Sequence, residues 1–210
     1  MPIEFKHLIY DKKHYLEHPE TINEDLMMCD EIAAECFKDC INLKNIIIPD
    51  SVEEIGKRCF ENCTNLSKIE ISNMVTKLDY CCCYRCSNLS TVLLSENLEE
   101  IGAYCFCDCP NLTRIVIPNS VTKLSEGCFC NCPNLSTVIL PENLKEIGNH
   151  CFCSCSNLTK IVLPKNLEKL GNKCFVGCSN LKEIKIPYDF VNMEDFYGCI
   201  NLKIINVYYG

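Results

Sequence analysis

The sequence predicts an α/β solenoid, a stack of short coils with a parallel sheet on one face and short helical turns on the other. A Cys-x-Asn-Leu segment recurs at intervals of 23 residues, with a last interval of 21, and the other features keep the same register. A coil of this length cannot enclose a core, so neighbouring coils must stack to bury a continuous one. The segment begins at Cys40, Cys63, Cys86, Cys109, Cys132, Cys155, Cys178 and Cys199.

The composition is that of a folded chain with an acidic surface. Of the 210 residues, 48% are hydrophobic and 23% are charged, which is enough apolar material for a core. The formal net charge is -8, and we expect no nucleic-acid partner because phosphate binding requires a basic surface. No apolar run approaches the roughly 20 residues of a membrane span, so we expect no membrane insertion.

Residues 1–28 do not follow the repeat and are mostly polar. Thr21 and Glu24 have the spacing of a capping box, which opens a helix. Because solenoids need terminal caps, we expect residues 1–28 to form an N-terminal cap and residues 29–210 to form a solenoid of seven to eight 23-residue coils. The first residues lack the apolar stretch of a signal peptide, so we expect a cytoplasmic location.

Each unit contains a short strand followed by a bend. Buried strand positions lie two residues apart, as at Ile115 and Ile117, and a proline such as Pro118 ends the strand because it cannot continue a ladder. Further along, apolar residues step by four, as at Cys59 and Cys63. This step predicts one or two turns of helix in every coil.

The 21 cysteines are the unusual feature of the composition. We interpret fifteen of them as small apolar core residues, because they occupy two columns on the face that also carries Ile and Leu. These are Cys36, Cys59, Cys82, Cys105, Cys128, Cys151 and Cys174, with the eight cysteines of the recurring segment.

Cys107, Cys130 and Cys153 form a third column, where metal ligation and disulfide formation are alternatives to simple packing. Histidine is almost absent from the repeats, and the odd cysteine total is typical of a reducing compartment. We therefore expect no metal and no cofactor. A catalytic cysteine would need a histidine nearby to activate it, and the only histidine next to a cysteine in the repeats is His150, beside Cys151. Because neighbouring side chains of a helical turn point in different directions, we expect no catalytic residues and no enzyme.

The repeat as a whole reads Leu-x-x-Ile-x-Ile-Pro-x-x-Val-x-x-Ile-Gly-x-x-Cys-Phe-x-x-Cys. It resembles the BspA-type leucine-rich repeats of bacterial surface proteins and parasitic protists over about residues 29–207. The resemblance implies a right-handed leucine-rich repeat solenoid whose parallel sheet binds other proteins. Many members of the family carry Ala where this chain has cysteine in the column that includes Cys59 and Cys105.

The outward side of the predicted sheet is the candidate binding surface. Side chains between the two buried strand positions point outward, and four neighbouring aliphatic ones there favour a contact patch, although β-branched residues also simply suit a sheet. Lysine and arginine side chains lie beside these aliphatic residues, and this combination would suit a partner segment that carries both acidic and apolar side chains. The predicted partner-binding residues are Ile47, Leu93, Val116, Ile139, Val162, Lys68, Arg114 and Lys160.

The last strand has no polar cap and would present an open edge. Tyr208 and Tyr209 either shield this edge or pair with a second copy, which makes a homo-oligomer possible. The sequence thus predicts a protein-interaction scaffold that binds a protein partner, or itself, through its sheet face. The alternative is a cell-surface adhesin reached by unconventional export, as the bacterial relatives suggest.

Overall fold

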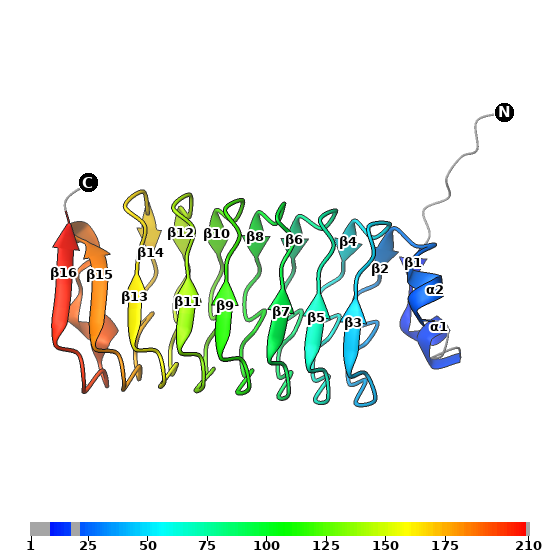
Figure 1. The fold of residues 1–210 in the computed structure, drawn as a ribbon, viewed down its shortest axis with the longest axis horizontal. Coiled ribbons are helices and arrows are strands. Elements are labelled where there is room, and N and C mark those ends of the chain that lie inside the picture. Colours follow the sequence, from blue (N-terminus) through cyan, green and yellow to red (C-terminus); the bar gives the residue numbers. More distant parts are fainter. Residues whose placement is uncertain (1–8, 18–21, 209–210) are drawn as a thin grey trace.

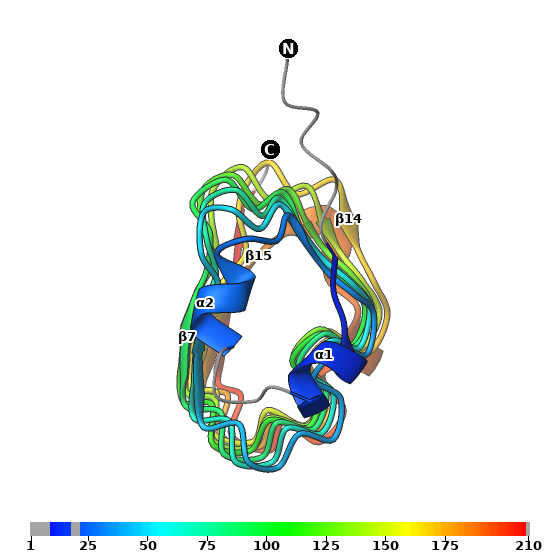
Figure 2. The same cartoon turned by 90° about the vertical axis from the view of Figure 1, so that its right-hand side faces the viewer.

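The computed structural model describes residues 9–17 and 22–208 as a straight stack of coils (Figure 1). Viewed end-on, the coils superimpose into one outline, so each repeat follows the path of its neighbours (Figure 2). Each inner coil contributes one strand to a front row and one to a second row. The front row consists of β3 (Asn45–Ile47), β5 (Lys68–Glu70), β7 (Thr91–Leu93), β9 (Arg114–Val116), β11 (Thr137–Ile139), β13 (Lys160–Val162), β15 (Glu183–Pro187) and β16 (Ile204–Tyr208).

The second row contains two-residue strands that the sequence did not predict. A two-residue strand is too short to show a periodicity, and we expected only a bend there. These strands are β1 (Ile9–Tyr10), β2 (Glu31–Ile32), β4 (Glu54–Ile55), β6 (Lys77–Leu78), β8 (Glu100–Ile101), β10 (Lys123–Leu124), β12 (Glu146–Ile147) and β14 (Lys169–Leu170).

All strand pairs are parallel and stay in register along the stack. Thr137 pairs with Arg114 in the front row, 23 residues earlier. Ile204 of β16 pairs with Glu183 of β15, so the shorter last repeat keeps the register. Between β15 and β16 the shorter repeat forms two short 3-10 helices, η1 (Tyr188–Phe190) and η2 (Met193–Phe196).

Successive tight turns replace the helical turns that we expected in the repeats. In the second coil the N–H groups of Glu61 and Cys63 bond within the coil, to Arg58 and Phe60, at 3.1 and 3.2 Å. The N–H groups of Phe60 and Asn62 instead donate to the next coil, both at 2.7 Å. Since a helix would use all of these donors internally, it could not also bond to a stacked neighbour.

The four-residue apolar step has a different origin from the one we assumed. Arg58 and Asn62, four residues apart, both have a left-handed backbone, with φ of 56° and 60°. Equivalent pairs recur along the stack, as at Tyr104 and Asp108. These left-handed residues, rather than helix geometry, turn every fourth side chain toward the core.

The core is a set of columns running the length of the stack. Phe106, Phe129, Phe152, Phe175 and Phe196 stack ring on ring, with centroids 5.6–5.9 Å apart. Phe37 and Phe60 form a separate stacked pair at 5.3 Å. Buried Cys83 occupies the phenylalanine position between the two groups and interrupts the column.

The N-terminal end of the stack carries the helices α1 (Lys12–Glu17) and α2 (Ile22–Leu26), which lie across the end of the first coil (Figure 2). Tyr15 of α1 packs edge-on against Phe37 with centroids 5.0 Å apart, and Leu26 of α2 is fully buried. Strand β1 pairs with β2 and places Tyr10 against the same Phe37 ring. The first phenylalanine of the core is thereby covered.

The front row is divided by two seams. Its strands form three hydrogen-bonded groups, β3-β5-β7, β9-β11 and β13-β15-β16, with no ladder between the groups among the described strands. The second row has one break, between β4 and β6. No helix within the described ranges is long and apolar enough to cross a membrane.

A candidate interaction groove on the front row

The strand pattern places the aliphatic stripe on the outer surface of the front row. In β9, Ile115 is buried and Val116 is exposed, because successive side chains of a strand point to opposite sides. The stripe consists of Leu93, Val116, Ile139 and Val162, whose exposed fractions lie between 43% and 47%. Four adjacent strands therefore present aliphatic side chains to solvent.

The two seams open the front row toward the core. Leu94 follows β7 and Leu140 follows β11, and both are partly exposed, whereas their counterparts Ile117 and Leu163 are buried. A cavity lies at each seam, with volumes of about 710 Å³ and about 700 Å³. Both cavities are lined by Ile139 and Leu140, so they form one groove that follows the stripe from β7 toward β16.

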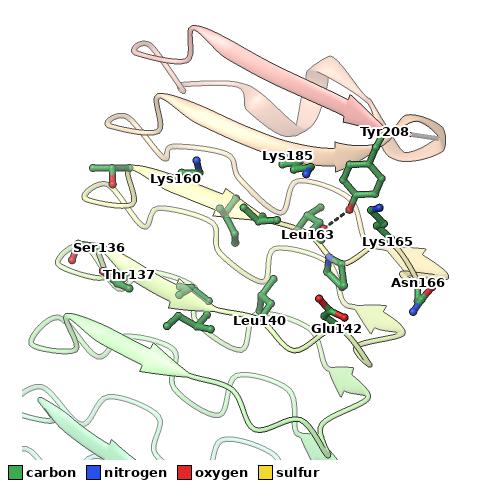
Figure 3. A pocket seen from close by; sticks show the side chains of 16 residues that line it. Ser136, Thr137, Leu140, Glu142, Lys160, Leu163, Lys165, Asn166, Lys185 and Tyr208 are labelled. Carbon is green, nitrogen blue, oxygen red and sulfur yellow. Dashed lines mark hydrogen bonds between the residues drawn. The ribbon is translucent and has the colours of Figure 1, made fainter. Parts of the chain in front are cut away.

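The cavity at the β11/β13 seam has an apolar floor and a cationic rim (Figure 3). Its lining includes Val138, Ile139, Leu140, Ile161, Val162, Leu163, Pro164, Glu142, Lys160, Lys165, Lys185 and Tyr208. Tyr208 comes from β16 and reaches across β15, where its hydroxyl donates to the Leu163 carbonyl, as the dashed line in Figure 3 marks. Burial raises the pKa of this phenol, so Tyr208 stays neutral and forms a fixed wall.

The lysines of this cavity differ in whether a nearby carboxylate neutralises their positive charge. Lys160 is paired with Glu183 at 3.0 Å. The Lys185 ammonium lies 5.5 Å from the centre of the Tyr208 ring, a cation-π contact that leaves its charge uncompensated by any carboxylate among the described residues. In a chain of net charge -8, Lys185 and Lys165 make this end of the groove locally positive against a single carboxylate, Glu142.

The structure separates the predicted binding residues into two sets. Arg114 lines the β7/β9 cavity and Lys160 lines the β11/β13 cavity, so both flank the groove as expected. Ile47 is exposed on β3 but lies apart from the groove, because Glu70 interrupts the stripe on the strand between. Lys68 pairs with Glu70 at 3.1 Å and lines neither cavity.

Lys185 and Tyr208 belong to the groove in a way that the sequence did not indicate. Lys185 belongs to the outward-facing column of the front row, but it lies at the polar end of that column, beyond the aliphatic stripe. Tyr208 was predicted to lie at the open edge of the last strand. Only the stacking of β13, β15 and β16 brings the two together. Tyr209 lies outside the described residues.

The fifteen core cysteines are buried as the repeat pattern predicts. In the column of the recurring segment, the thiols donate to backbone carbonyls of the preceding coil, as from Cys63 to Phe37 at 2.9 Å and from Cys132 to Phe106 at 3.0 Å. Burial raises the pKa of the Cys132 thiol to about 12 and that of Cys151 well above its ordinary value. The Cys132 and Cys151 thiols therefore remain protonated at neutral pH.

Within the described ranges, no group of three or more His, Cys, Asp and Glu side chains could hold a metal ion. The third cysteine column is more accessible than the other two. Cys107 is buried, but Cys130 and Cys153 are partly exposed at the surface of the turns.

Comparisons with known proteins agree with this architecture. Six copies of the "BspA type Leucine rich repeat region" match residues 21–135 and 99–209. A leucine-rich repeat protein of T. pallidum is 32% identical, with a TM-score of 0.70, over 73% of this chain and 72% of its own. A leucine-rich repeat protein of Bacteroides ovatus is 25% identical, with a TM-score of 0.65, over 86% of this chain.

The chain spans 64% of the Bacteroides ovatus protein. No curated protein matches the chain. Proteins built from these repeats are generally modules for protein interaction. Because the repeat matches cover nearly the whole sequence, the chain belongs to the BspA-type leucine-rich repeat family.

Proposed function

We propose that this protein is an interaction module that binds a protein partner in the groove along the front row. The observation that carries the proposal is the continuous aliphatic stripe that runs between two seam cavities. A contiguous exposed apolar surface is costly to leave in water and marks interaction sites in soluble proteins. The partly exposed Leu94 and Leu140 extend this apolar surface into the cavities.

The partner that fits this groove is an extended segment with both apolar and acidic side chains. Apolar side chains would enter the seam cavities, where Leu140 and Val162 provide contacts. Carboxylates would meet Lys185 at one end and Arg114 at the other, and Arg114 has no ion pair among the described residues. Such charge pairing sets orientation and specificity more than affinity.

A displayed library of random 12-residue peptides tests this proposal with a defined probe. We expect selection on the full chain to enrich peptides that combine Asp or Glu with Leu, Ile or Phe. Val116→Asp with Ile139→Asp should abolish their binding. Lys185→Glu should weaken acidic peptides at least about tenfold, the effect of losing roughly 1.4 kcal/mol.

Ile41→Asp is the matched control, because Ile41 is also an exposed isoleucine but lies outside the front row. This variant should bind the selected peptides as the parent does, and circular dichroism should show that all variants fold. Peptides that bind the Val116→Asp, Ile139→Asp variant as well as the Ile41→Asp variant would show that the groove is not the site.

Self-association through β16 is a second proposal, supported by a separate observation. Ile204 and Val207 of β16 are exposed, at 48% and 41%, and one edge of β16 has no partner strand among the described residues. Antiparallel pairing of two copies about Asn206 would set Ile204 opposite Tyr208 and pair the open edge of β16. Light scattering at increasing concentration should then show a dimer that Ile204→Lys converts to a monomer, and a monomer at all concentrations would exclude it.

A further inference from the structure

The third cysteine column differs from the other two in what its thiols contact. In the column of the recurring segment, each thiol from Cys63 onward donates to a carbonyl of the preceding coil, as from Cys155 to Phe129 at 3.1 Å. The Cys130 thiol makes no such bond to a carbonyl among the described residues, and its side chain instead interacts with those of Cys107 and Cys153 in the two neighbouring coils. Three thiols from successive coils therefore form a row along the turns, with Cys107 buried and the other two partly exposed.

The backbone holds these three cysteines in register. The N–H of Asp108 donates to the Cys130 carbonyl at 3.0 Å, and the N–H of Asn131 donates to the Cys153 carbonyl at 2.8 Å. Neighbouring strands are about 4.8 Å apart, which lies within the roughly 4.4–6.8 Å that a disulfide spans between Cα atoms. The expected spacing of the backbone is therefore compatible with a disulfide between each adjacent pair.

We propose that Cys107, Cys130 and Cys153 form a peroxide-reactive thiol site in which Cys130 is the nucleophile and either neighbour is the resolving thiol. Cys130 lies in the middle coil and is the one of the three cysteines with a neighbouring thiol on both sides. Cys130 is also partly exposed, so a small hydroperoxide can reach it, whereas the core cysteines are shielded. Tyr84 and Val176 occupy the positions before and after the three thiols and limit the site to them.

The electrostatics of the column support the same assignment. Hydrogen bonding from Cys107, helped by Cys153, lowers the pKa of Cys130 to about 7 despite the opposing effects of burial and of Asp108. The same contact raises the pKa of Cys107, and burial raises that of Cys153. The thiolate, which is the reactive form of cysteine, is therefore concentrated at Cys130.

The reaction is a two-electron oxidation by a hydroperoxide. The Cys130 thiolate attacks the terminal peroxide oxygen, an S–O bond forms and the O–O bond breaks, and the departing alkoxide or hydroxide takes up a proton. Cys107 or Cys153 then loses its proton and attacks the sulfenic sulfur, so that an S–S bond forms and the S–O bond breaks with release of water. Two thiols are oxidised, and the peroxide is reduced to water and an alcohol, or to two waters.

Hydrogen peroxide added to the reduced full chain tests the site, with free thiols alkylated afterwards and peptides mapped by mass spectrometry. We expect one disulfide, Cys107 to Cys130 or Cys130 to Cys153, and a loss of two free thiols. Cys130→Ser should abolish the disulfide. Cys107→Ser with Cys153→Ser should leave a sulfenic acid at Cys130 that dimedone traps.

Cys29 provides the internal reference, because it is the other partly exposed cysteine and lies outside the column. Cys130 should be oxidised at least about tenfold faster than Cys29, and Cys29→Ser should leave disulfide formation unchanged. Circular dichroism should show that the serine variants fold, since serine is close to cysteine in size and Cys130 and Cys153 are partly exposed. Equal oxidation of Cys29 and Cys130, or a disulfide that persists in Cys130→Ser, would overturn the proposal.

Discussion

Glycine is required in this fold by the closeness of the coils more than by backbone conformation. Residues with a left-handed backbone recur in every turn, and many are not glycine, such as His150 with φ of 56°. Gly148 has an ordinary φ, but a Cβ placed there would lie 2.5 Å from the backbone nitrogen of Glu126 in the preceding coil. A side chain at Gly148 would therefore push two coils apart.

The contrast between two glycines gives the first prediction. Gly148→Ala should lower the free energy of unfolding by about 2–3 kcal/mol, as overpacking against a rigid backbone does. At Gly177, where φ is 75° and the nearest atom to a Cβ is the Ser154 hydroxyl at 3.3 Å, alanine should cost about 1 kcal/mol through its backbone conformation. Chemical denaturation of both variants checks this, and equal losses would show that the coils are not closely packed at Gly148.

At the level of the elements, charges alternate along the second row of strands from β6 to β14. Glu100 of β8 lies between Lys77 of β6 and Lys123 of β10, at 3.7 and 3.3 Å. Burial raises the pKa of Glu100, but the Ser125 hydroxyl, Lys123 and Lys77 outweigh it, so the net pKa lies below the ordinary value. The alternation opposes a slip by one coil, because a slip would set like charges opposite each other.

The second prediction concerns the pH dependence of this charge cluster. Since the folded-state pKa of Glu100 is lowered, its contribution to stability is present above the unfolded-state value of about 4.3 and is lost as the pH falls through the folded-state value. Glu100→Gln should therefore cost a few tenths of a kcal/mol to about 1 kcal/mol at pH 7 and less at pH 3.

Denaturation at both pH values measures this effect, with Glu54→Gln as the control at the equivalent position of β4. Glu54 has the same place in its strand but no ion pair among the described residues. Its replacement should change the stability little at either pH. A loss for Glu100→Gln that is the same at pH 3 as at pH 7 would rule out the ion pairs as its cause.

At the level of the whole molecule, the coil that contains β6 and β7 is the least connected to its neighbours. Strand β6 pairs with β8 but not with β4, and β7 pairs with β5 but not with β9. Cys83 interrupts the phenylalanine column in the same coil. In a solenoid the stability of each coil depends on its neighbours, so three missing contacts in one coil weaken the stack there.

The third prediction is that hydrogen exchange is uneven along the stack. Backbone amides of residues 77–93 should exchange at least about tenfold faster than those of residues 123–139, because local opening needs less free energy where fewer contacts join the coils. In the second set, β10 pairs on both sides and Phe129 stacks against two rings. Uniform exchange rates across the two sets, measured by mass spectrometry, would contradict this weak point.

Much of the architecture and part of the groove could be predicted from particular residues. The alternation at Ile115, Val116 and Ile117 correctly indicated which side chains are buried in the front row. The step from Cys59 to Cys63 was wrongly interpreted as helix, because tight turns with left-handed residues reproduce the same spacing. The short strands of the second row were missed because two residues show no period.

The 23-residue period was sufficient to determine the solenoid, its burial pattern and the outward position of the stripe. A repeated pattern specifies which side chains face inward in every coil, and stacking follows because no coil can bury its core alone. The seams, the two cavities and the meeting of Lys185 with Tyr208 were decided only by the tertiary structure. These features depend on how closely particular coils approach each other, and this spacing results from packing along the whole stack rather than from any one repeat.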